Sequence, residues 1–387
     1  MADLPRLTTL AVDYSEHEQY MRNYRAHGTA RALALDNRGP IRFDKQANLA
    51  PEIIDAYTHY GFFIFEGLLD TDELTDLDAD LIDILKHAPA ASDSTLDAKA
   101  RPAIGVDCKG GTFTWVKPLS DPRGGTDVSC GRHPVKMFEP KPPDDAPEQV
   151  IQLLFGALQF SDAFLRLYAH PDLLTATANI NGKDFTPFNE AIFIKQPRLG
   201  GTVSWHQDGW THWHKPDADE HTHGFNFMAQ LYGCNAENGL WIVPGSHRKK
   251  ADIAGMVASA GSERIAGAVP LVCRPGDVAM TCRQVVHGSF ANTSADWRVT
   301  FNFGFHRRAS VRNVRSGGVH SAAAFYDDAY IHERSRLIGY GIDARRQHFP
   351  DETPYIYEPL AHDMQSYRWT AQTRTSLKDY NLKDLGI

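Results

Sequence analysis

Two residues that could bind a metal ion lie two positions apart in the segment VSWHQDGW, residues 203–210. The valine and tryptophans around them favour a β-strand, in which side chains i and i+2 point to the same face. His206 and Asp208 could therefore offer an imidazole nitrogen and a carboxylate oxygen to one ion. Such a pair is common by chance, so the spacing alone only indicates a site.

A third candidate ligand lies in another strand-like segment, VVHGSF, where His287 follows His206 by 81 residues. Two histidines and one carboxylate on one side of an ion leave its opposite positions open. This facial arrangement is typical of non-haem Fe(II) oxygenases.

The elements that would position these ligands are short segments of β-branched and aromatic residues between about residues 180 and 310. They include FNEAIFIKQPR, TVSWHQD, FNFMAQLYG, GLWIVPGS, GDVAMTC, VVHGSFAN and RVTFNFGFH. Their spacing, with turn residues between them, predicts an antiparallel sandwich or barrel. In RVTFNFGF the apolar residues alternate with Arg298, Thr300 and Asn302, which we expect on the opposite face.

The rest of the chain divides into three parts around this β-core. Residues 1–50 are expected to form an irregular arm. Residues 51–310 are expected to form one domain, with a helix–strand–helix start over residues 51–86, loops at 88–148, helical periodicity at 149–178 and the β-core at about 180–310. Asp70 and Glu73 have the spacing of a capping box. Residues 311–387 are expected to be an extension of loops and short helices, packed on the core or over the site.

Composition excludes several classes of protein. The 387 residues are 42% hydrophobic and 23% charged, which is typical of a globular protein. A net charge of −8 argues against nucleic acid as a partner. The chain starts without a signal-peptide pattern, and its most apolar run, residues 150–160, is too short to span a membrane. Five scattered cysteines without a C-x-x-C pair favour a cytoplasmic location.

The segments around the three candidate ligands resemble a known family. WHQD, then NGLWIVPGSH, then PGDVAMTCRQVVHGSFANTSADWR is similar in order and spacing to the phytanoyl-CoA dioxygenase family of Fe(II)/2-oxoglutarate-dependent oxygenases. The segment YGFFIFEGLLDTDEL also looks like the start of that family's domain. The resemblance covers about residues 55–306, loosely between 88 and 180, and NGLWIVPGSH is one residue shorter than the family's longer form.

The resemblance implies a mainly β fold with flanking helices and a double-stranded β-helix core, a cupin-like jelly roll. It implies that His206, Asp208 and His287 are the catalytic Fe(II) ligands, and that 2-oxoglutarate and O₂ are cosubstrates. A small-molecule substrate would be hydroxylated, desaturated or cyclised with release of succinate and CO₂. Halogenating relatives have a small residue in place of the carboxylate, so Asp208 argues against halogenation.

Binding of 2-oxoglutarate needs a cation for its far carboxylate. Arg298, eleven residues after His287, can supply a bidentate guanidinium, and Ser289 can add a hydroxyl. The resemblance also places Lys195 towards the cosubstrate, although a solvated lysine at a strand end explains it equally well. Residues expected around the substrate, or behind those that touch it, are Asn189, Trp210, Gln230 and Trp241, with Asn226 as a weaker candidate. The histidines at 212, 214, 221 and 223 are expected in a loop over the site.

Two other classes stay open at this point. A zinc-dependent hydrolase could use the same three ligands, but it would have no need of Arg298. A non-catalytic jelly-roll protein that only binds a small molecule would tolerate the loss of a ligand, and all three are present. The arm and the extension could also form the contact of a homodimer.

Overall fold

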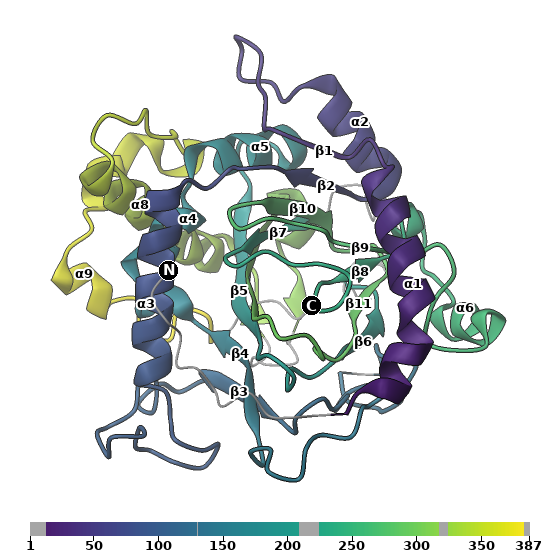
Figure 1. Cartoon of the computed structure of the whole chain (residues 1–387). Helices are drawn as coiled ribbons and strands as arrows, with labels where there is room; N and C mark the ends of the chain where they lie inside the picture. The colour runs from purple at the N-terminus through teal and green to yellow at the C-terminus, as the bar shows by residue number, and fades with distance from the viewer. Residues whose placement is uncertain (1–12, 130, 209–223, 317–323, 383–387) are drawn as a thin grey trace.

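The strand-like segments pair into two sheets that form a jelly-roll core, as predicted (Figure 1). The computed structural model describes residues 13–129, 131–208, 224–316 and 324–382. The large sheet has the order β1 (Arg38–Gly39), β2 (Phe62–Phe65), β10 (Val278–Cys282), β7 (Gly224–Gln230), β12 (Arg298–His306), β5 (Thr186–Lys195), β4 (Val150–Phe155) and β3 (Phe113–Val116). The small sheet has the order β6 (Val203–His206), β11 (His287–Ser289), β8 (Trp241–Ile242) and β9 (Val269–Pro270). A separate pair joins β13 (Arg315–Ser316) to β14 (Ala324–Phe325).

The two faces of the large sheet differ in chemistry, and β12 shows this most clearly. Its four apolar residues, Val299, Phe301, Phe303 and Phe305, are fully buried in the main hydrophobic core. Each buried side chain of this size contributes about 1.5–3 kcal/mol. The alternate residues of the strand line a cavity on the other face. The predicted alternation is confirmed.

Helices cover the apolar face of the large sheet. They are α2 (Pro51–Tyr60), α3 (Thr71–Lys86), α4 (Asp162–Tyr168), α5 (Pro171–Asn181) and α8 (Asp328–His348). Figure 1 shows α3, α4 and α8 together on one side of the molecule, away from the small sheet. The predicted capping box starts α3, where the Asp70 carboxylate accepts the Glu73 N–H at 2.8 Å. The remaining helices are α6 (Ile253–Ala260), α7 (Arg308–Val311), α9 (Ala371–Thr375), η1 (Ala157–Gln159), η2 (Ser246–Arg248) and η3 (Glu358–Ser366).

The N-terminal arm contains a long helix, so the expectation of an irregular segment is wrong. Helix α1 (Ser15–Leu33) lies along the small sheet beside β9 (Figure 1). Its buried side is formed by His17, Met21, Arg25, Gly28 and Ala32. These positions have helical spacing, but only one of them is a large apolar residue. The helix therefore carries no hydrophobic periodicity that the sequence could reveal.

Two further expectations are corrected. Residues 150–155 form strand β4 rather than a helix. The prediction failed because hydrophobic periodicity cannot distinguish a short apolar strand that is buried on both faces from a buried helix. The C-terminal extension contains the 21-residue helix α8 rather than only short helices. The large sheet also takes strands β1 to β4 from before residue 180. No helix in the described part of the chain is both long and apolar enough to cross a membrane.

Candidate metal centre and cavity

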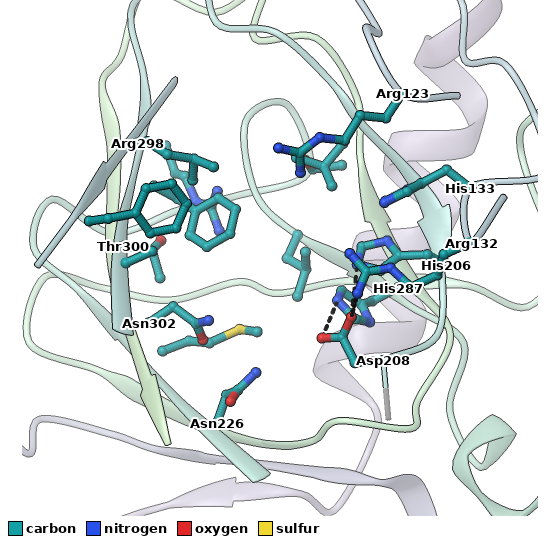
Figure 2. A pocket seen from close by; sticks show the side chains of 18 residues that line it. Arg123, Arg132, His133, His206, Asp208, Asn226, His287, Arg298, Thr300 and Asn302 are labelled. Carbon is teal, nitrogen blue, oxygen red and sulfur yellow. Dashed lines mark ion pairs between the residues drawn. The ribbon is translucent and has the colours of Figure 1, made fainter. Parts of the chain in front are cut away.

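His206, Asp208 and His287 meet at one end of the small sheet. His206 ends β6 and is paired directly with His287, the first residue of β11. Asp208 lies just beyond the strand, where its N–H donates to the carbonyl of Arg283 at 3.0 Å. Its carboxylate oxygens lie 3.4 Å from Nε2 of His206 and 3.8 Å from Nε2 of His287 (Figure 2). All three side chains are buried.

The backbone fixes the orientation of both imidazoles. Nδ1 of His206 lies 2.8 Å from the Ser204 carbonyl, and Nδ1 of His287 lies 2.9 Å from the Val285 carbonyl. Because a carbonyl oxygen only accepts, each Nδ1 donates to its carbonyl, and each Nε2 is thereby turned towards Asp208.

The donor set fits one divalent ion. The three ligand atoms lie within 4.8 Å of one another. The carboxylate–imidazole distances of 3.4 Å and 3.8 Å are near the roughly 3 Å between neighbouring ligand atoms that bonds of about 2.1 Å would give. Nitrogen, nitrogen and carboxylate oxygen on one side of an ion is the ligand set of non-haem Fe(II) sites.

Electrostatics favour the ligand form of these groups. Burial alone would raise the pKa of the Asp208 carboxyl, but the Arg132 guanidinium, 3.3 Å from its Oδ1, and the two imidazoles hold this pKa well below its usual range. Burial and the neighbouring His206 lower the pKa of His287 to about 4. At neutral pH the site therefore presents a carboxylate and a neutral imidazole at His287.

The opposite wall of the cavity comes from the large sheet. Arg298, Thr300 and Asn302 of β12 and Asn226 of β7 face the three candidate ligands across the cavity (Figure 2). Arg298 is only 3% exposed, and no carboxylate in the described part of the chain lies within 4 Å of its guanidinium.

Ser289 lines the same cavity from the small sheet. Its buried Oγ has no hydrogen-bond partner among the described residues. A buried cation and a buried hydroxyl that no described residue satisfies are costly, so both point to a ligand with an acidic group.

Two other predicted residues lie behind the cavity wall. Lys195 is paired with Arg298 across β5 and β12, but its Nζ donates to the Phe290 carbonyl and it does not line the cavity. Burial lowers the pKa of Lys195 well below its usual value. Gln230 is also buried, and its Oε1 accepts the hydroxyl of Thr300 at 2.8 Å. Gln230 therefore orients a residue of the wall.

Trp241, expected around the substrate or behind the residues that touch it, does not line the cavity. Its indole is fully buried, donates to the Ala236 carbonyl at 3.2 Å and stacks on Tyr24 of α1 at 4.4 Å. Trp241 thus packs the arm against the small sheet. Trp210 and the histidines at 212, 214, 221 and 223 lie outside the described residues, as does the side chain of Asn189.

The sequence interpretation missed three residues of the site, Arg123, Arg132 and His133. They come from the loop between β3 and β4. The His133 ring lies 4.3 Å from the His206 ring, and its Nδ1 is 3.1 Å from the Ser204 carbonyl. Burial, above all, lowers the pKa of His133 to about 2. The loop has no hydrophobic periodicity. The only sequence feature that could have indicated a role in the site is the presence of two arginines and a histidine in a glycine-rich stretch.

A jelly roll with two histidines and a carboxylate facing its cavity has the ligand set of non-haem iron oxygenases. Comparison with known proteins gives similar families and structures. Residues 133–300 match the family model described as phytanoyl-CoA dioxygenase (PhyH). Phytanoyl-CoA dioxygenase domain-containing protein 1 of Bos taurus is 26% identical over 280 residues, which cover 66% of this chain and 90% of that protein. The same protein of Rattus norvegicus is 25% identical over 279 residues, with the same coverage.

Solved structures are similar as well. EctD from S. alaskensis, crystallised with 2-oxoglutarate and 5-hydroxyectoine, is 18% identical with a TM-score of 0.48, covering 71% of this chain and 82% of that one. Residues 133–300 of this chain are thus similar to the phytanoyl-CoA dioxygenase (PhyH) family.

Proposed function

We propose that this protein oxidises a C–H bond of a small-molecule metabolite, by hydroxylation, desaturation or ring closure. In this proposal His206, Asp208 and His287 hold Fe(II), while Arg298 and Ser289 hold 2-oxoglutarate. The observation that carries it is the arrangement across one cavity, with the three candidate ligands on the small sheet and the buried guanidinium of Arg298 on the large sheet.

The bound ion, with 2-oxoglutarate and O₂, supplies the oxidising chemistry. The protein supplies orientation. Carbonyls of Ser204 and Val285 keep Nε2 of both histidines turned towards the ion position. Asp208 fills one further position with a negative charge and so excludes external halide, which favours oxygenation or dehydrogenation over halogenation.

Arg298 sets the direction in which 2-oxoglutarate lies. A guanidinium binds a carboxylate bidentately, so the far carboxylate would lie against β12 and the keto-acid end would face the three ligands. Ser289 is two residues after His287 on β11 and would donate its hydroxyl to the cosubstrate. Both groups would then obtain the partner that the described part of the protein does not provide.

The cavity suits a small substrate. Apolar side chains line much of it, namely Leu153, Phe155, Ala191, Phe193, Met228 and Leu240. Such walls exclude water from the reacting groups. A cytoplasmic location and a homodimer stay predictions.

The test is release of succinate. Protein stripped of metal would be given Fe(II), 2-oxoglutarate and O₂, with Zn(II) without 2-oxoglutarate as the parallel arm. We expect succinate only with Fe(II), and none from Asp208→Ala. Hydrolysis of a substrate with Zn(II) and without 2-oxoglutarate would indicate a hydrolase instead. Binding of small molecules without succinate under any condition would indicate a non-catalytic protein.

A further inference from the structure

Two buried amide side chains of the large sheet face the candidate metal ligands. Asn302 of β12 and Asn226 of β7 both line the cavity, and they are 9% and 4% exposed. Figure 2 shows them at the opposite end of the wall from Arg298, facing Asp208. We propose that these two amides bind a neutral group of the substrate that donates a hydrogen bond, a hydroxyl or an amide N–H. This inference rests on the proposed function and names its substrate class.

The register of β7 and β12 places the two amides next to each other on one face of the sheet. Asn302 is paired with Met228, and Asn226, two residues before Met228, is paired with Gly304. Diagonal neighbours of this kind lie roughly 7 Å apart. A Cβ at Gly304 would lie 2.3 Å from the Phe225 carbonyl and 2.6 Å from Oδ1 of Asn226. The glycine therefore leaves the space that the Asn226 side chain occupies.

Neither amide oxygen has a hydrogen-bond partner in the described part of the chain. Oδ1 of Asn226 and Oδ1 of Asn302 are both buried and unpaired. The protein does satisfy their neighbours on the same wall. The Thr300 hydroxyl donates to Oε1 of Gln230 at 2.8 Å, and Nε2 of Gln230 donates to the Met228 carbonyl at 3.1 Å. Buried polar groups without a partner are unfavourable and uncommon, so two of them at one end of the cavity indicate a place for a ligand.

The chemistry of the amides defines the group that they would bind. A carbonyl oxygen accepts and cannot donate, so its complement is an O–H or an N–H. The amide nitrogens can donate in turn, and a hydroxyl or an amide both donates and accepts. A carboxylate, by contrast, would bring acceptors only and would leave both oxygens unpaired.

The position of the amides separates them from the cosubstrate. Arg298 and Asn302 are four residues apart on β12, which is roughly 13 Å along a strand. The carbon chain of 2-oxoglutarate is shorter than this span, and in the proposed function it runs from Arg298 towards the three ligands. The amides would therefore contact the substrate, and a carbon beside the bound group would face the ion position.

The test measures equilibrium binding without turnover, on protein loaded with Fe(II) and saturating 2-oxoglutarate under anaerobic conditions. The probes are alkan-1-ols of increasing length, each paired with the 1-fluoroalkane of the same chain, and primary alkanamides, each paired with its N,N-dimethyl form. The second member of each pair cannot donate a hydrogen bond. We expect the best donor to bind about tenfold more tightly than its partner, because only the donor satisfies the buried oxygens. The two series distinguish a hydroxyl from an amide.

Variants of the two asparagines locate the effect. Asn302→Leu and Asn226→Leu nearly keep the size of the side chain and remove the amide. Each should remove most of the preference for the donor and leave the affinity for 2-oxoglutarate unchanged, with circular dichroism to show that the variant is folded. Asn302→Thr should retain part of the preference, because its hydroxyl can still accept. The matched control is Asn23→Leu, at an exposed position of α1, which should change neither affinity.

Three results would overturn the inference while leaving the proposed function intact. One is that no alcohol or amide binds more tightly than its partner. Another is that the preference persists in both leucine variants. The third is that these variants weaken binding of 2-oxoglutarate instead, which would make the asparagines cosubstrate contacts. Failure of the wild type to bind Fe(II) or 2-oxoglutarate at all would instead refute the proposed function, and the inference with it.

Discussion

The imidazole rings of His206 and His287 lie 4.1 Å apart, on directly paired residues of the antiparallel strands β6 and β11. Each ring is oriented by the backbone carbonyl two residues earlier, at Ser204 and Val285. The same local device on both strands turns both Nε2 atoms towards Asp208. The candidate metal centre is therefore arranged by the backbone, and loss of one ligand side chain should not unfold the protein.

Replacement of Arg298 should weaken binding of 2-oxoglutarate. Arg298→Gln would remove the charge-assisted pair to the far carboxylate, a loss of about 1.5–3 kcal/mol, or about 10–150-fold in the 2-oxoglutarate concentration required. Arg298→Lys should rescue only part of this, because a point charge cannot copy the bidentate guanidinium. The measurement is succinate formation against 2-oxoglutarate concentration.

The control for this series is Arg274→Gln, at an exposed position on the protein surface. It should leave the 2-oxoglutarate requirement unchanged. An unchanged requirement in Arg298→Gln itself would mean that another cation anchors the acid, and Lys195, paired with Arg298 in the sheet, would be examined next.

Stability should fall as the pH drops below about 6.5, the ordinary value for histidine. Burial and the nearby Arg345 lower the pKa of His170 well below that value, so the folded state binds fewer protons than the unfolded state. The stabilising effect is then complete above pH 6.5 and is lost on acidification, at up to about 1.4 kcal/mol per pH unit for each such histidine. The buried His17 and His133, whose pKa values burial lowers to about 4 and about 2, act in the same direction.

His170→Asn tests this linkage without removing a helix cap. The His170 side chain accepts the Asp172 N–H at the start of α5, and asparagine can do the same. The free energy of unfolding should fall in both proteins between about pH 6 and about pH 5. We expect this fall to be about 1 kcal/mol smaller in the variant than in the wild type. His362→Asn, at an exposed position, is the control. Equal pH slopes for wild type and His170→Asn would refute the role given to His170.

A substitution in α1 should destabilise the protein although it improves helix propensity. Alanine in place of Gly28 would gain about 1 kcal/mol in the helix itself. The added Cβ, however, would lie 2.5 Å from the ring of Trp241, which is fully buried and cannot move aside. Overpacking of this kind costs about 1–3 kcal/mol, so we expect a lower Tm for Gly28→Ala.

The matched control is Asn23→Ala on the exposed side of the same helix. It should raise Tm slightly, because only propensity changes there. A raised Tm in both variants would mean that α1 does not pack against Trp241 as described.

Local patterns in the sequence were sufficient to predict those features of the fold that depend on interactions between residues close in the chain. The alternation in β12 predicted which residues face the cavity, and the spacing of Asp70 and Glu73 predicted the start of α3. The i, i+2 spacing of His206 and Asp208 placed them together. Their approach to His287 depends on the register between β6 and β11, which no local pattern specifies; the strand-like segment of His287 indicated a third ligand, and the family resemblance supported it.

The remaining features depend on tertiary contacts. Arg123 reaches the cavity because Asp121 ties its loop through backbone N–H groups, and such bonds leave no periodic trace in the sequence. Helix α1 was missed because its buried side contains glycine, arginine and histidine. Lys195 was expected at the cosubstrate, but its ammonium group donates a hydrogen bond to the carbonyl of Phe290.

The most direct test of the central claim is the amount of Fe(II) bound per chain in anaerobic equilibrium dialysis, with 2-oxoglutarate present. Wild type, His206→Ala, Asp208→Ala and His287→Ala would be compared, with circular dichroism to show that each variant is folded. We predict about one Fe(II) per chain for the wild type, since one facial set of two histidines and a carboxylate holds one ion, and a large loss in each variant. Full Fe(II) binding by a folded His206→Ala or His287→Ala protein would contradict the assignment of the metal centre.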